Sequence, residues 1–271
     1  MPLKVLEVSI IMVGLHMIVF PIDGGALGMY VEEQLYLSNA DVIVQYNTST
    51  VQSFDDWQGL APSVESLTVT SQSCNDPKVK SLDFSKFSQL VYVMINDQCF
   101  RYVEKVVFSG MERLARITVG VSCFAENPYH GKLNKSRSLT IKNCPVLNEL
   151  NISRYSFSDY YSFTLSHVPQ LQSLLIGDGD SSNNFQYCPD FHLIDLIKLQ
   201  SIDLGSGSFM NASSIRFESK SNNRVIYIDL PSLQTIRMGS DTCMGSEVER
   251  RKILRKLPNS LSMKSLKDEM E

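Results

Sequence analysis

Most signatures of catalysis and metal binding are missing from this sequence of 271 residues. It contains no Walker-type phosphate loop, no Gly-x-Gly-x-x-Gly dinucleotide motif and no Gly-x-Ser-x-Gly nucleophile elbow. No two of its six cysteines form a Cys-x-x-Cys pair, which excludes a zinc ribbon and a thioredoxin-like redox site. None of its four histidines pairs with another at the helical spacing of metalloproteases. We therefore expect no enzyme: no catalytic residue, no metal site and no cofactor.

An excess of charge of one sign is also missing. The chain carries 25 Lys and Arg against 29 Asp and Glu, and a net charge of −4 argues against a broad nucleic-acid-binding surface. Gly and Pro, at 14 and 10 residues, are too few for a collagen-like or linker-like chain. The 43% of hydrophobic residues is enough for a sizeable core and too much for a disordered chain.

Long apolar runs are scarce, and the one near the N-terminus is ambiguous. Val8 to Phe20 is apolar apart from three residues, but it is too short for a membrane span. It has the character of a signal-peptide core, yet Lys4 is the only basic residue before it and no clear cleavage site follows. Alternatively, Leu3, Leu6 and Val8 open a truncated repeat. We favour the repeat, and we expect no membrane span elsewhere.

What the sequence does contain is an internal repeat. The pattern Leu-x-x-Leu-x-Ile, with other apolar residues at the same positions, recurs at spacings of 24 to 34 residues. A second apolar set precedes most copies by eight, six and three residues, as Phe163, Leu165 and Val168 precede Leu171. The copies begin at Val64, Leu90, Leu114, Leu147, Leu171, Leu199 and Leu233.

An aromatic residue marks most copies at the tenth position after their start. Phe100, Phe124, Phe157 and Phe209 occupy it, whereas the copy at Leu171 has Ser181 there. Because equivalent residues of stacked repeats lie above one another, we expect these rings to form an interior column. Cys74 and Cys243 hold the position in their copies, and Gly177, Gly205 and Gly239 are expected to form tight turns after the strands.

These periods predict a mainly β solenoid of stacked repeats of about 24 residues, with short parallel strands. A single repeat cannot bury its own apolar face, so neighbours must stack. We expect degenerate repeats over 1–63, a regular solenoid over 64–245, and a helical cap or tail over 246–271, which opens with the capping box Ser246 to Glu249. Residues 126–137 and 218–224 are polar and read as inserted loops.

The segments Leu171 to Gly177 and Leu199 to Phe209 resemble leucine-rich-repeat proteins, particularly the divergent BspA-like kind. The resemblance covers about residues 64 to 243. It implies a solenoid of the α/β leucine-rich-repeat class and a role in binding a protein or a glycan. The chain departs from the commonest repeat because it lacks the Asn/Cys-x-Leu step after the strand, which puts a helix-backed horseshoe in doubt.

We expect a non-catalytic protein-binding module that presents the outer face of its first set of strands. Side chains alternate faces along a strand, so residues between the buried positions must point outward. A fragment of a larger adhesion solenoid and a polysaccharide-acting β-helix enzyme stay open as alternatives. The expected partner is a protein, with a glycan as a second option. The candidate contact residues are Tyr92, Met94, Arg116, Glu149, Asn151, Leu175, Asp203 and Arg237.

The cysteines leave the compartment open. Cys99 and Cys123 share one repeat position, and Cys144 shares a position with Val168 and Leu196, which indicates buried thiols that act as small hydrophobes. A disulfide between Cys99 and Cys123 stays open, because neighbouring repeats would bring them together. Four Asn-x-Ser sequons do not establish secretion, and the cytoplasm is slightly favoured.

Overall fold

The computed structural model describes residues 17–18, 43–44, 46–129, 132–178, 181–221, 224–227, 235–238, 242 and 262–265. The chain divides into two compact units, residues 1–47 and 48–271. In the first unit, β1 (Met17–Ile18) pairs with β2 (Ile43–Val44) in an antiparallel arrangement. The rest of the apolar run Val8 to Phe20, and with it the choice between signal segment and repeat, lies outside the described residues.

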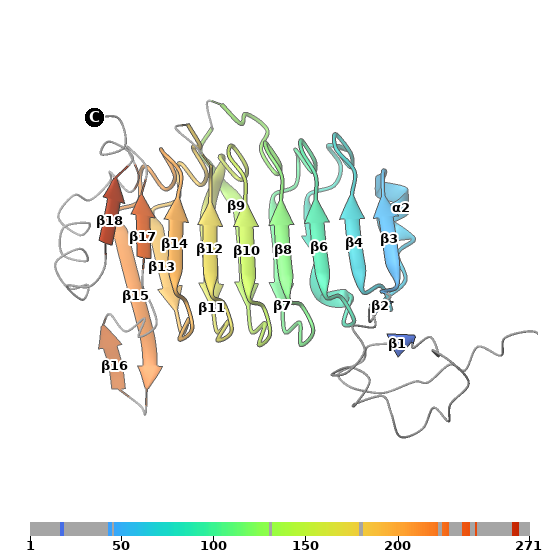
Figure 1. The fold of residues 1–271 in the computed structure, drawn as a ribbon. Helices are drawn as coiled ribbons and strands as arrows, with labels where there is room; N and C mark the ends of the chain where they lie inside the picture. The colour runs from blue at the N-terminus through green and yellow to red at the C-terminus, as the bar shows by residue number, and fades with distance from the viewer. Residues whose placement is uncertain are drawn as a thin grey trace, which may run out of the picture. The chain divides into compact units, whose positions relative to one another are not determined.

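The second unit contains a nine-stranded sheet within the described residues, here called the first sheet (Figure 1). Its neighbouring strands are all parallel. In spatial order they are β3 (Thr48–Val51), β4 (Ser66–Val69), β6 (Tyr92–Ile95), β8 (Arg116–Val119), β10 (Glu149–Ile152), β12 (Ser173–Ile176), β14 (Ser201–Leu204), β17 (Thr235–Met238) and β18 (Ser262–Ser265).

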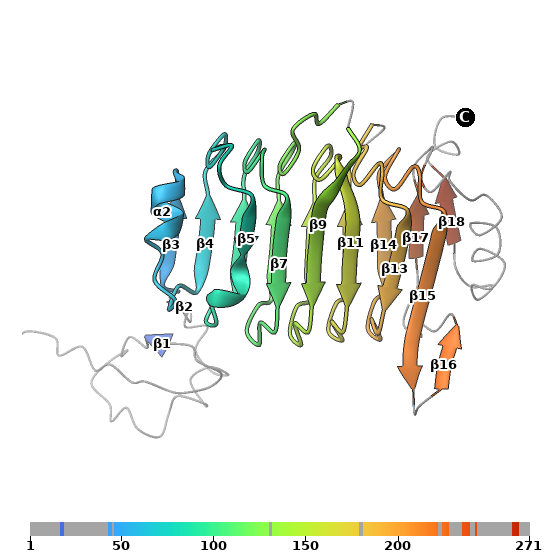
Figure 2. The ribbon, with the colours of Figure 1, turned by 180° about the vertical axis from the view of Figure 1, so that it is seen from behind.

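A second sheet of seven described strands lies on the other side of the stack (Figure 2). It contains β5 (Ser81–Asp83), β7 (Lys105–Ser109), β9 (Asn134–Lys142), β11 (Tyr160–Ser166), β13 (Asp190–Ile194), β15 (Ser214–Ser221) and β16 (Arg224–Tyr227). All neighbours are parallel except β16, which runs antiparallel to β15. The repeat rule places Val225 and Tyr227, eight and six residues before Leu233, in a parallel strand, and the predicted direction is wrong because β16 is antiparallel. Only two residues separate β15 from β16, and so short a connection can join only antiparallel strands.

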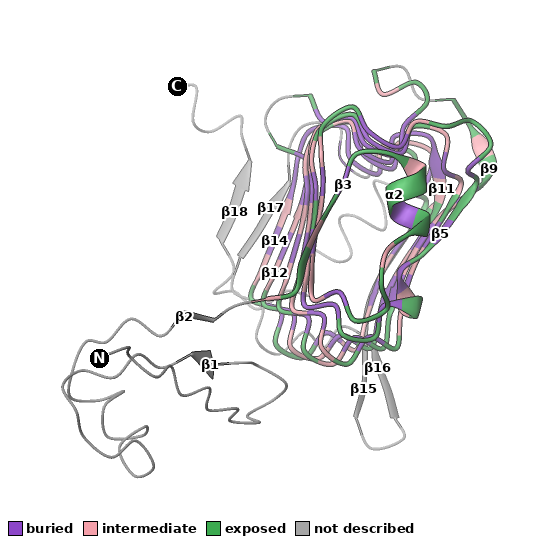
Figure 3. Cartoon of the chain, turned by 90° about the vertical axis from the view of Figure 1, so that its right-hand side faces the viewer, coloured by how far each residue is buried: buried purple, intermediate pink, exposed green. Residues whose placement is uncertain are grey.

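From β4 to β15 the chain passes alternately through the two sheets, and Figure 3 looks along the stack with the sheets on opposite sides. Equivalent residues of successive copies pair directly, as Leu150 pairs with Ile117 on one side and Leu174 on the other. Apolar side chains of both sheets share one buried cluster. The predicted mainly β architecture with parallel strands is confirmed.

The predicted column of rings is also present. Phe100, Phe124 and Phe157 stack with centroids 5.2 and 4.6 Å apart. Phe185 stacks 5.3 Å from Phe157 and 5.0 Å from Phe209, so it belongs to the same column. The expectation that the copy at Leu171 lacks a ring is wrong. Its turn is four residues longer than that of the other copies, which moves the phenylalanine beyond the tenth position.

The turns after the first-sheet strands share a left-handed backbone. Phe124 has a φ of 55° and Ser122, two residues earlier, has a φ of 57°, and the copies from Val64 to Leu199 repeat this pair of positive angles. Gly177 adopts a φ of 81°, as the predicted tight turn requires. Gly205 serves a different purpose, because a Cβ there would overlap the Ser182 hydroxyl. Gly239 lies outside the described residues.

A short helix covers one end of the ring column. The helix α2 (Phe54–Gln58) begins at Ser53, whose hydroxyl accepts a hydrogen bond from the Asp56 backbone amide, and Asp56 caps Ser53 in return. Trp57 is buried and packs edge-on against Phe84, in the 3-10 turn η1 (Phe84–Lys86), at 4.9 Å, and against Phe100 at 5.9 Å. The tryptophan therefore extends the column to the start of the stack.

Both expected loops are partly strand. Residues 134–137 of the first insertion belong to β9, and Arg137 is only 1% exposed. Residues 218–221 of the second continue β15. The capping box at Ser246 lies outside the described residues, and Ser262–Ser265 form β18 within the expected helical segment. The first sheet begins at Thr48, inside the segment 1–63. The other domain boundaries and the C-terminal helix stay predictions.

Candidate binding face

The outer face of the first sheet consists of two columns of strand positions. Pairing between strands puts the predicted residues in these columns, with Tyr92 beside Arg116 and Glu149, and Met94 two residues along the same strand. Val93 and Ile95, which alternate with Tyr92 and Met94 along β6, are buried, so the predicted orientation is confirmed. One column contains Thr48, Ser66, Tyr92, Arg116, Glu149, Ser173, Ser201, Thr235 and Ser262, and the other contains Thr50, Thr68, Met94, Thr118, Asn151, Leu175, Asp203, Arg237 and Lys264.

Met94 is the most prominent apolar side chain on this face, with 47% of its surface exposed. Tyr92 and Leu175 are half-buried. Arg237 lies beside Asp203 in the backbone register, but its side chain is outside the described part. Polar and hydroxyl residues surround Tyr92 and Met94, so the face combines an apolar centre with a polar margin.

The charges at the centre of the face are already paired. Arg116 Nε lies 2.6 Å from Glu149 Oε2, so the two charges on the adjacent strands β8 and β10 form an ion pair. The Asn151 side-chain amide donates a hydrogen bond of 2.6 Å to the other Glu149 oxygen. A partner that covers Tyr92 and Met94 therefore meets a compensated pair beside them.

A second polar group lies where the first-sheet strands begin. Arg113 Nη1 contacts Glu65 Oε1 at 3.2 Å and Gln89 Oε1 at 2.6 Å. These three residues precede three successive first-sheet strands, β4, β6 and β8. Because both charged side chains are largely buried, the contact ties neighbouring copies together at the rim of the face.

Behind the face, one repeat position forms a column of buried donors that hold successive copies in register. The residue before each ring donates to a backbone carbonyl of the preceding copy. Cys99 Sγ, Cys123 Sγ, Ser156 Oγ and Asn184 Nδ2 donate to the carbonyls of Thr70, Asn96, Gly120 and Ser153 over 2.9, 2.9, 2.6 and 2.8 Å.

This column, which we call the donor ladder, was not foreseen from the sequence. Several residue types fill the position, and in each of these copies a phenylalanine follows it. The signal was the recurring Cys, Ser, Asn or Thr before the ring position. Cys99 and Cys123 are buried in the apolar cluster as predicted, and their thiols are also hydrogen-bond donors.

The five described cysteines are free thiols. The disulfide between Cys99 and Cys123 that the sequence left open is thus not formed. Burial raises the pKa of the Cys144 thiol to about 11 and that of Cys188 to about 11 as well. Raised values keep these thiols protonated and unreactive at neutral pH.

The second sheet carries the described histidine contacts. His192 Nε2 lies 2.8 Å from Ser214 Oγ and 3.7 Å from Asp190 Oδ1. In a catalytic triad the serine and the carboxylate contact opposite ring nitrogens, whereas here both approach Nε2. His167 Nε2 pairs with Asp195 Oδ2 at 3.0 Å. Within the described residues, no three His, Cys, Asp or Glu side chains are grouped to hold a metal.

Comparisons with known proteins identify no relative. The chain matches no family model, and searches of curated proteins and of solved structures return no match. In the described part of the chain, no helix has both the length and the apolar character needed to cross a membrane.

Proposed function

We propose that this chain is a non-catalytic protein-binding module built as a repeat solenoid related to the leucine-rich-repeat kind. The direct pairing of equivalent residues in both sheets supports a solenoid, as do the ring column and the donor ladder. The donor ladder supports the stacking of repeats, since a polar donor follows each first-sheet strand from β6 to β14.

The observation that carries the proposal is the exposed Met94 on a rigid sheet beside the paired Arg116 and Glu149. Binding energy at protein interfaces comes mostly from a few central apolar or aromatic anchors within a polar rim. Methionine and tyrosine adapt well to a partner's surface. Because the strands are already ordered, binding here costs little conformational entropy.

In this proposal Tyr92 and Met94 form the anchor, and Leu175 is a second apolar contact farther along the sheet. Arg116, Glu149 and Asn151 act as one hydrogen-bonded unit that orients the partner. Asp203 and Arg237 extend the polar margin toward the end of the stack.

Affinity purification with three full-length variants tests the assignment. Met94→Asp places a charge at the centre of the face, and Tyr92→Ala removes the aromatic contact. Thr140→Asp is the matched control, because Thr140 lies half-buried on the outer side of β9 in the second sheet. Proteins retained by the wild-type chain and by Thr140→Asp, but lost with both face variants, would support the proposal. Retention by all three variants would contradict it.

A further inference from the structure

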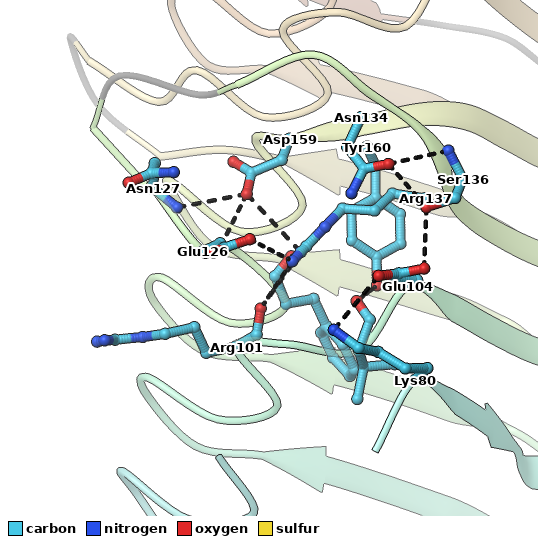
Figure 4. A network of polar contacts seen from close by, with 12 residues as sticks. Lys80, Arg101, Glu104, Glu126, Asn127, Asn134, Ser136, Arg137, Asp159 and Tyr160 are labelled. Atoms are coloured by element: carbon cyan, nitrogen blue, oxygen red, sulfur yellow. Dashed lines mark hydrogen bonds and ion pairs between the residues drawn. The ribbon is translucent and has the colours of Figure 1, made fainter. Parts of the chain in front are cut away.

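The inserted segment 126–137 is held by a buried charged group. Arg137 and Asp159 have side chains 1% and 2% exposed, and Arg137 Nη1 lies 3.7 Å from Asp159 Oδ2 (Figure 4). The Arg137 guanidinium also donates to the backbone carbonyls of Phe124, at 3.1 Å, and Arg101, at 3.2 Å. Glu126 Oε2 lies 3.4 Å from Nη2 on the exposed side.

The same group grips the first residues of the insertion. Asp159 Oδ2 accepts hydrogen bonds from the backbone amides of Glu126, at 2.8 Å, and Asn127, at 3.3 Å. The Arg137 guanidinium carbon lies 5.6 Å from the Tyr160 ring centre, and the buried Tyr160 hydroxyl donates to the Val103 carbonyl. We call Glu126, Arg137 and Asp159 the clasp.

The clasp fixes both ends of the insertion, since Glu126 opens it and Arg137 closes it. Burying an ion pair has a large desolvation cost and adds little net stability. The connection from β8 to β9 contains the insertion, whereas the equivalent connection from β10 to β11 has none. The clasp therefore fixes the conformation of the two described ends of the inserted segment before any partner arrives.

The described residues of the insertion present two apolar side chains to solvent. Tyr129 is 61% exposed and Leu133 is 48% exposed, more than any other large hydrophobic residue among those described. Tyr129 rests edge-on against Tyr155, with ring centroids 4.9 Å apart. Four residues of chain keep Tyr129 and Leu133 within about 14 Å of each other.

Three cations lie along the insertion and the clasp. Lys132 and Lys135 belong to the insertion, and the backbone carbonyl of Arg101 accepts a hydrogen bond from Arg137. Arg101, Lys132 and Lys135 are exposed, and none has an ion-pair partner in the part of the chain that the structure describes. The Arg101 side chain points away from the clasp in Figure 4. The nearby carboxylates are already engaged, because Glu104 pairs with Lys80 and accepts from Ser136, while Glu126 and Asp159 belong to the clasp.

We propose that this loop surface, formed by Arg101, Tyr129, Lys132, Leu133 and Lys135, is a second docking site whose partner is an acidic polypeptide segment with an apolar side chain. The apolar side chain contacts Tyr129 and Leu133, and the flanking carboxylates pair with the three cations. This site is separate from the face of the first sheet in residues and in chemistry, since the central charges of that face are compensated.

Selection of peptides on the purified full-length chain tests the proposal. A random dodecapeptide display library is panned at low salt, and recovered peptides are measured by fluorescence anisotropy. We expect peptides with several Asp or Glu next to Phe, Leu or Trp. Their affinity should fall at least fivefold with Tyr129→Ser and with the double variant Lys132→Glu/Lys135→Glu, and at least threefold when salt rises from about 50 to about 200 mM, because exposed charges are screened.

Two further variants separate docking from general damage. Val146→Ser, at an exposed apolar position elsewhere, should bind like the wild type. Asp159→Asn leaves the contact residues in place but loosens the clasp, so it should weaken the peptide while leaving Met94-dependent partners unchanged. A selection that yields no peptides, or peptides indifferent to Tyr129→Ser, overturns the proposal. So does loop-dependent binding of heparin or of phosphatidylserine vesicles without peptide binding.

Discussion

Single residues at the position before each ring show how different side chains perform one task. Cys123 and Ser156 both donate to a backbone carbonyl of the preceding copy. Ser156 also accepts a hydrogen bond of 2.9 Å from the Cys123 amide. The position therefore selects a small donor, not a particular residue type, and a search for one letter would miss it.

Replacement of Ser156 tests the ladder. Ser156→Ala leaves the Gly120 carbonyl and the Cys123 amide without their buried partner, which should lower the free energy of unfolding by about 1–3 kcal/mol. Ser156→Cys restores the donor used at position 123 and should lose less. Urea denaturation of both variants measures the difference, and equal losses would show that the hydrogen bonds do not matter.

The ring column makes a larger prediction. Phe124 is fully buried between Phe100 and Phe157, so Phe124→Ala should lower the free energy of unfolding by about 3–5 kcal/mol. Val146→Ala, at an exposed site, is the control and should change it by less than about 0.5 kcal/mol. A loss below about 1 kcal/mol in the Phe124 variant would contradict the packing.

Cys144 gives a prediction about pH. Burial raises the pKa of its thiol from 9.0 to about 11. Between these values the unfolded chain loses the proton and the folded chain keeps it, so the stabilisation present below pH 9 is lost as pH rises toward 11. Cys144→Val places the residue used at position 168 and should flatten the fall in unfolding free energy. Urea melts at several pH values measure both slopes, and identical slopes would contradict the burial.

At the scale of elements, strand positions were predictable because two apolar periods coincide in each copy. The interruptions were not. The pattern did not predict the ring of Phe185, because the turn before Phe185 has four more residues than in the other copies. It did not predict the antiparallel direction of β16, because that direction follows from the short connection after β15. The burial of Arg137 was not predicted, because a charged residue in a polar segment is normally solvated. Only the fold brings Asp159 beside it.

The clasp predicts that the inserted segment is not uniformly dispensable. Arg137→Met removes one partner of a buried ion pair and should lower the free energy of unfolding by about 3–5 kcal/mol. Replacing residues 128–133 with two glycines keeps the clasp and should change it by less than about 1 kcal/mol, because loop length affects closure entropy only slowly. Thermal melts of the two variants compare them. A shortened loop that unfolds like Arg137→Met would show that the whole segment is structural.

At the scale of the whole molecule, the sequence predicted a mainly β architecture and the side of each strand that faces the core. It also predicted the outer positions of the candidate face, since alternation along a strand leaves no other arrangement. It did not predict the loop surface, because the importance of Tyr129 and Leu133 depends on contacts between distant residues. Sequence periodicity predicts the repeated strands, whereas the contacts made by insertions and irregular turns become apparent only in the structure.

The central claim is that the outer face of the first sheet, anchored at Met94, contacts the partner. Hydroxyl-radical footprinting of the chain, alone and with a partner recovered by affinity purification, tests it most directly. The account predicts that oxidation of Met94 and Tyr92 falls at least threefold in the complex, while that of Val146 and Ile197, exposed elsewhere, is unchanged. Unchanged oxidation of Met94 in a saturated complex would contradict it.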